Sequence, residues 1–172
     1  RRVGVGDHVS LVFENHDTVL WQVQEMVRTE RIGDPAAIRF ECDTYNELCP
    51  AAGELSATLF IEIVDQARAR EMLDQLIGLD EHVVFRVGPH AIRAEFDPGR
   101  STAERIAAVQ YVKFRLSPEA IADLRRPSTE VALEIDHPNY RAQSVLAAQT
   151  RASLVGDLTA RPRAQRPSAA AP

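Results

Sequence analysis

The stretch VSLVFENHDTVLWQVQEMVRTERI, residues 9–32, decides the expected fold, because it changes from strand to helix within one turn. Val9, Leu11 and Phe13 alternate with other positions, which predicts a strand with one buried face. The next residues, NHDT at 15–18, predict a turn that ends in a helix N-cap, and an apolar stripe follows at helical spacing. The stretch also carries many amides and carboxylates for a segment that helps to build a core.

The same patterns over the rest of the chain predict about six strands and five helices. Strands are expected at residues 3–14, 54–64, 82–87, 91–96, 107–116 and 130–137. Helices are expected at residues 19–32, 34–49, 66–79, 117–125 and 147–158. Because hairpin-like neighbours replace a regular βαβ alternation, the expected class is α+β, a mostly antiparallel sheet with helices packed on one face.

The chain of 172 residues is expected to form a single α+β domain over residues 1–158, followed by a disordered Arg/Pro/Ala tail at 159–172. It opens on Arg1 and Arg2 without a Met, so we expect that a native N-terminal segment is missing.

The net charge of −5 includes three arginines in the last twelve residues, so the preceding body is more acidic still. An acidic body argues against nucleic-acid binding, which requires clustered Lys or Arg. No apolar run is long enough to span a membrane, and no signal-peptide pattern is present, so a cytoplasmic protein is expected.

Two residue types limit covalent chemistry. Cys42 and Cys49 lie seven apart in an expected helix, a spacing of about 10 Å that is too long for a disulfide. We interpret them as small hydrophobic residues rather than reactive thiols. Lys113 is the only lysine, and its strand-like surroundings favour a solvated, outward-facing side chain.

Five blocks of sequence together resemble a known bacterial family. They are RRVGVGDHVSLVFENHDTVLWQVQEMVRTERI (1–32), YNELCPAAGELSATLFIEI (45–63), LIGLDEHVVFRVG (76–88), FDPGRSTAERIAAVQYVKF (96–114) and DHPNYRAQ (136–143). In this order they resemble domain-of-unknown-function family 3501. The resemblance implies no established activity, and it implies a link to redox or peroxide stress, because members are often encoded beside rubrerythrin-like and iron–sulfur proteins.

A carboxylate–histidine cluster is the first candidate site. Its candidate metal ligands are Glu14, Glu25, Glu62, His82 and His137. Carboxylates with one or two imidazoles suit iron, manganese or zinc. The alternative is structural: strand-end carboxylates are usually solvated, a histidine on an apolar face is usually hydrogen-bonded, and no HExxH or ExxH spacing is present.

The segment DHPNY, residues 136–140, is the second candidate. Asp136 and Tyr140 could orient His137 as a general base, which makes His137 and Tyr140 the candidate catalytic residues. The alternative is a strand end followed by a turn, and no nucleophile elbow supports a hydrolase.

The segment GRSTAER, residues 99–105, is the third candidate. Ser101 and Glu104 fit a capping box, so Arg100 and Ser101 are candidate anion-binding residues at a helix start. The alternative is a helix cap that binds nothing.

The polar side chains inside the apolar elements are the fourth candidate. Gln22 in the first helix and Gln110 and Tyr111 in a strand predict either a buried hydrogen-bond network or the lining of a pocket. Trp21 is expected to be a pocket wall or a core residue.

Two functions follow from these observations. The first is an accessory or binding protein that works with rubrerythrin-like or iron–sulfur partners. The second is a metal-dependent enzyme or metal-binding protein that uses the carboxylate–histidine cluster with a divalent metal. The sequence leaves open whether the protein is an enzyme.

Overall fold

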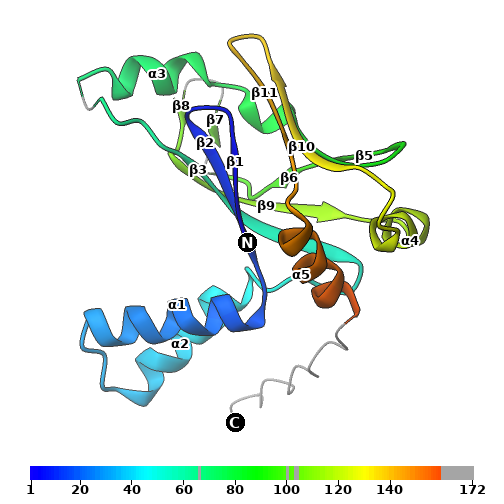
Figure 1. The fold of residues 1–172 in the computed structure, drawn as a ribbon. Coiled ribbons are helices and arrows are strands. Elements are labelled where there is room, and N and C mark those ends of the chain that lie inside the picture. The colour runs from blue at the N-terminus through cyan, green and yellow to red at the C-terminus, as the bar shows by residue number, and fades with distance from the viewer. Residues whose placement is uncertain (66, 100, 103–104, 160–172) are drawn as a thin grey trace.

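The computed structural model describes residues 1–65, 67–99, 101–102 and 105–159, and they form an α+β fold (Figure 1). Its helices are α1 (His16–Thr29), α2 (Pro35–Asn46), α3 (Ala69–Gln75), the short 3-10 helix η1 (Leu79–Glu81), α4 (Pro118–Arg125) and α5 (Ala148–Thr159). Its strands are β1 (Arg2–Val5), β2 (Val9–Glu14), β3 (Glu54–Ile61), β4 (Val83–Val87), β5 (His90–Arg93), β6 (Glu95–Phe96), β7 (Ser101–Thr102), β8 (Arg105–Ile106), β9 (Val109–Arg115), β10 (Val131–His137) and β11 (Tyr140–Val145).

The strands are antiparallel and divide over two main sheets. The first sheet has the order β1-β2-β3-β9-β6, and the second has the order β11-β10-β4-β5. The expected α+β class and antiparallel pairing are confirmed. The division into two sheets depends on pairs that are distant in the chain, β3 with β9 and β10 with β4, which local alternation of residues does not specify.

Three phenylalanines join the two sheets. Phe13 of β2, Phe114 of β9 and Phe85 of β4 are fully buried, and their ring centroids lie 5.5–6.3 Å apart. The Phe13–Phe85 pair meets edge to face, a favoured geometry for aromatic rings. The inner faces of both sheets therefore share one hydrophobic core.

Several expected elements differ from the structure. Residues 3–14 form the β1–β2 hairpin rather than one strand, because Gly6 turns the chain. The strand β11 was not expected, since its side chains alternate between half-buried and exposed without an apolar face. The helix start that the capping-box pattern suggested at Ser101 is not present. Ser101 lies in β7, which pairs with β8, and the short run before β9 leaves little room for a stable helix. Residues 160–172, nearly all of the expected tail, lie outside the described residues.

The helix α2 starts at its predicted cap, whereas α1 starts at His16 and is capped by Asn15, not by the end of the 15–18 turn as predicted. The Asn15 side chain accepts hydrogen bonds from the backbone N–H groups of Asp17 and Thr18, and the Thr18 hydroxyl accepts one from the Asn15 N–H. Asp34 caps α2, with Pro35 as its first residue. In Figure 1 the helical pair, α1 with α2, projects from one end of the two sheets.

A tyrosine fixes the β1–β2 turn against the second sheet. The Tyr140 hydroxyl donates to the Val5 carbonyl at 2.6 Å and accepts from the His8 N–H at 3.1 Å. Gly6 at this turn has a φ of 73°, and a Cβ at Gly6 would lie 2.4 Å from the Tyr140 hydroxyl oxygen. Both the backbone angle and the space therefore require glycine.

We expect Gly6→Ala to lower the free energy of unfolding by at least about 1–3 kcal/mol, the usual cost of a strained backbone position. Equilibrium urea unfolding would measure the change. Gly4→Ala in the same hairpin is the matched control, because no atom lies within 4 Å of an added Cβ there. Equal loss in the two variants would contradict the role given to the Tyr140 contact.

Candidate functional site

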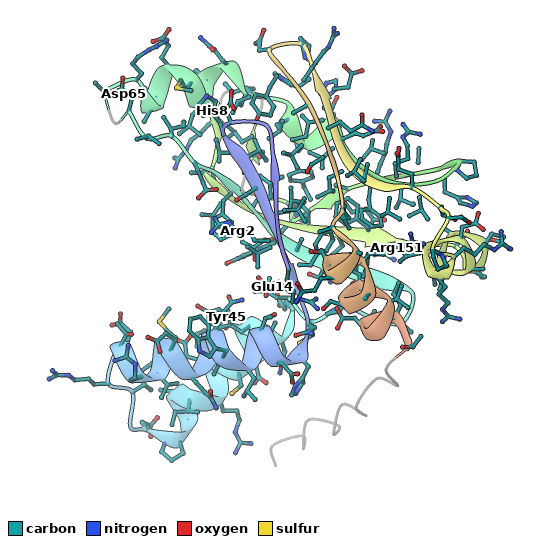
Figure 2. All side chains as sticks on the ribbon, in the orientation of Figure 1. Arg2, His8, Glu14, Tyr45, Asp65 and Arg151 are labelled. Carbon is teal, nitrogen blue, oxygen red and sulfur yellow. The ribbon has the colours of Figure 1, made fainter. Side chains whose placement is uncertain are left out.

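The expected metal ligands do not gather at one place. Figure 2 shows Glu14 at the junction between the sheets and the helical pair, whereas Glu25 and Glu62 engage other partners. Only His82 and His137 lie together, with ring centroids 5.2 Å apart. Within the described residues, no group of three His, Cys, Asp or Glu side chains is placed to hold a metal ion.

Glu14 belongs to a buried hydrogen-bond network. Its carboxylate is 3% exposed and accepts hydrogen bonds from Thr18 at 2.5 Å, Gln22 at 3.0 Å and Thr58 at 2.8 Å. Neutral donors thus replace the water that this carboxylate loses on burial. The network attaches α1 to β3, so Gln22 has the structural role that was one of its two predicted roles.

Glu25 and Glu62 form ion pairs near the surface. The Arg28 side chain hydrogen-bonds to Glu25, and this bond lowers the pKa of the Glu25 carboxyl. Glu62 accepts from Arg2 at 2.9 Å and from Ser10 at 2.6 Å. Both carboxylates are therefore already paired with cations of this chain.

His137 is buried, and both of its ring nitrogens are engaged. Nδ1 accepts from the Asn139 N–H at 3.2 Å, so the proton lies on Nε2, which donates to the Ile77 carbonyl at 3.0 Å. The Tyr140 hydroxyl turns to β1, and Asp136 pairs with Arg141 at 2.8 Å. The DHPNY segment is thus the tight turn between β10 and β11, with no free imidazole nitrogen at His137 to act as a base.

The two candidate anion-binding residues are not both placed. Arg100 lies outside the described residues. Ser101 is a strand residue, so the free amides of a helix N-terminus, on which its predicted role depends, are not present at this position.

A pocket of about 490 Å³ lies between α2 and the polar face of the first sheet, the face directed away from the second sheet. On this face, Ser56 of β3 is opposite Lys113 of β9, and Tyr111 follows two residues before Lys113. The pocket is lined by residues from four places: α2 with the residues that follow it, β3, β6 with its neighbours, and β9. The lining residues are Glu41, Thr44, Tyr45, Glu47, Leu48, Ser56, Glu95, Phe96, Asp97, Pro98, Tyr111, Val112 and Lys113.

Acidic and aromatic side chains dominate this pocket. Burial, then the neighbouring Tyr111 and Glu41, raise the pKa of Tyr45, which Figure 2 labels on the helical pair. The ammonium of Lys113 lies 3.4 Å from the buried carboxylate of Glu54. Glu95 pairs with Arg115 at 2.9 Å. The pocket therefore keeps a negative character although it contains a lysine.

The sequence indicated this pocket only in part. Tyr111 was expected to belong to a network or a pocket, and it lines the pocket. Trp21, expected in a pocket wall or the core, is 64% exposed and does not line this pocket. The α2 residues gave no signal, because most of their partners in the pocket come from β6 and β9, which lie far later in the chain. A run of acids and one tyrosine on a helix is usually a solvated face.

The cysteines fit the predicted inert role. Cys42 and Cys49 are free and half-buried. Burial, with a smaller contribution from Glu14, raises the pKa of the Cys49 thiol, so less of the reactive thiolate is present at neutral pH.

We expect His137→Ala to lower the free energy of unfolding by about 1–3 kcal/mol, because the Ile77 carbonyl and the Asn139 N–H lose their partner. Urea unfolding with and without Fe(II), Mn(II) or Zn(II) would test this, with the exposed His16→Ala as control. Stabilisation of the wild type by a metal, absent in His137→Ala, would instead support a metal site.

Comparisons with known proteins agree with the fold. Among the residues that the structure describes, no helix has both the length and the apolar composition needed to cross a membrane. No curated protein matches the chain. A crystal structure titled as a novel protein of unknown function from Burkholderia pseudomallei K96243 is similar, with 34% sequence identity and a TM-score of 0.84. The match covers 92% of this chain and 83% of that chain. The sequence also matches the family described as "Protein of unknown function (DUF3501)" over residues 1–158, so the chain belongs to the DUF3501 family.

Proposed function

We propose that this protein is an accessory protein that binds a small ligand in the pocket between α2 and the first sheet. The observation that carries the proposal is the pocket itself, a concave site of about 490 Å³ with aromatic walls and several polar groups. Small-molecule sites in proteins have this size and this mixture of surfaces.

The supporting argument concerns how the pocket is built. Glu14, Ser56 and Thr58 are buried on the polar face, so the helical pair has to cover a surface that is not hydrophobic. Hydrogen bonds to α1 fasten one part of this cover. The α2 side of the cover leaves the pocket open beside Ser56, Tyr111 and Lys113, where a ligand would meet hydrogen-bonding groups held by rigid strands.

Use of iron, manganese or zinc by the carboxylate–histidine residues is an alternative proposal. It needs Glu14, Glu25 or Glu62 to leave hydrogen bonds and ion pairs that each already makes. The ligand-binding proposal requires no such rearrangement, and we therefore rank it first.

A second candidate function is the binding of a redox protein, an iron–sulfur or rubrerythrin-like partner, by the helical pair. Leu20, Trp21 and Phe40 are 46%, 64% and 69% exposed on α1 and α2. Exposed aromatic side chains of this kind often anchor protein interfaces.

Thr44→Trp tests the ligand-binding proposal, because Thr44 is exposed and lines the pocket, where an indole would take up the ligand's space. We expect compounds found by ligand-observed NMR with the wild type to lose at least about tenfold in affinity, equivalent to about 1.4 kcal/mol. Asn46→Trp, exposed on the same helix but outside the pocket lining, is the matched control and should bind normally. Equal binding by Thr44→Trp, or no binding by the wild type, would refute the proposal.

Trp21→Ser combined with Phe40→Ser tests the partner-binding candidate. We expect the double variant to fold normally, since both side chains are exposed, and to lose a micromolar complex with a rubrerythrin-like or iron–sulfur protein in a sedimentation or calorimetric assay. Val145→Ser, which removes an exposed apolar side chain from β11, should keep the complex. A wild type that binds none of these proteins would exclude this candidate.

A further inference from the structure

We propose that the pocket between α2 and the first sheet selects a small organic cation, a primary amine or guanidine joined to an apolar body. This inference rests on the proposed function, because it names the ligand class of the same site. It comes from the charge of the pocket rim and from the aromatic side chains in its walls.

The charge at the rim is asymmetric. Four carboxylates line the pocket, Glu41 and Glu47 from the α2 side and Glu95 and Asp97 from the β6 side, against the single ammonium of Lys113. The Lys113 charge is opposed by Glu54, which is not part of the lining, at 3.4 Å. The positive charge that the pocket contains is therefore largely compensated from outside it.

The α2 side carries the uncompensated negative charge. Glu95 is paired with Arg115, whereas Glu41 and Glu47 form no ion pair with any described Arg or Lys. The higher pKa of Tyr45 agrees with this picture, since Glu41 is one of its causes after burial and Tyr111. A cation that enters between α2 and β9 would thus serve as the counter-charge for Glu41 and Glu47, whereas an anion would be repelled.

The walls suit an apolar body attached to that cation. Tyr45, Phe96 and Tyr111 line the pocket from α2, β6 and β9. Aromatic faces bind ammonium and guanidinium groups by cation–π attraction and also cover hydrocarbon. The carboxylates approach from opposite sides, and no three of the described His, Cys, Asp and Glu side chains converge on a point, so an extended organic cation fits better than a metal ion.

Three compounds of one shape and different charge test the selectivity: 2-phenylethylamine, 2-phenylethanol and 3-phenylpropanoate. We expect the amine to bind most tightly in calorimetry or ligand-observed NMR, the alcohol several-fold more weakly and the carboxylate not measurably. Added salt should weaken the amine towards the alcohol, because the rim carboxylates are exposed to screening.

Glu41→Gln should weaken amine binding about two- to fivefold, the range expected for one partly exposed charge, and leave alcohol binding unchanged. Glu30→Gln removes the same charge from an exposed position at the end of α1, outside the pocket, and is the matched control. Loss of amine binding in Thr44→Trp would assign the effect to the pocket.

Two results would overturn the inference in different ways. If amine and alcohol bind equally, or Glu41→Gln leaves amine binding unchanged while Thr44→Trp abolishes it, the pocket binds ligands without selecting cations. If Thr44→Trp binds the amine as the wild type does, the pocket is not the site, and the proposed function fails together with the inference.

Discussion

The contact of Phe13, Phe85 and Phe114 between the two sheets is the interaction on which the rest of the structure depends. Through these rings the inner faces of the two sheets pack into one hydrophobic core. Since side chains alternate along a strand, the residues next to them in β2, β3 and β9 must point to the opposite face. That opposite face of the first sheet is polar, with Ser10, Glu14, Glu54, Ser56 and Thr58 all buried on it. Hydrogen-bond partners for these groups are therefore needed. The helix α1 meets part of this need, because Thr18 and Gln22 donate to Glu14, whereas Ser10 bonds to Arg2 and Glu62.

Hydrogen bonds and an ion pair of Arg1 help to attach the helical pair. The Arg1 guanidinium donates to the carbonyls of Phe13 and Glu14 and to the side chains of Ser153 and Asp157. Asn15, the cap of α1, donates to the other oxygen of Asp157. The end of β2, the start of α1 and the helix α5 are thus fixed to one another at a single point. The direction in which α1 leaves the sheets, and with it the geometry of the pocket under α2, follows from this arrangement.

Local features of the fold were predictable, and long-range ones were not. The caps at Asp34 and Ser117 depend on neighbouring residues, so the starts of α2 and α4 follow from the sequence, whereas α1 begins at His16, before the predicted residue 19. His137 continues the apolar alternation of β10 and is buried, but that alternation alone did not distinguish a buried side chain from one at the sheet edge. The division into two sheets depends instead on pairs between distant strands. For the same reason the pocket was largely missed: Tyr45 and Tyr111 lie 66 positions apart in the sequence and share a cavity only because α2 folds over β9.

The single lysine described above has a practical meaning for anyone who handles this protein. Lys113, on β9, is the only side-chain amine in the sequence, and it borders the pocket. Amine-reactive dyes, biotin esters and carboxyl-coated sensor surfaces can modify only this side chain. On a side chain, each of them would therefore be attached beside the pocket. The same property makes Lys113 the one side chain at which an amine-directed modification would alter the pocket.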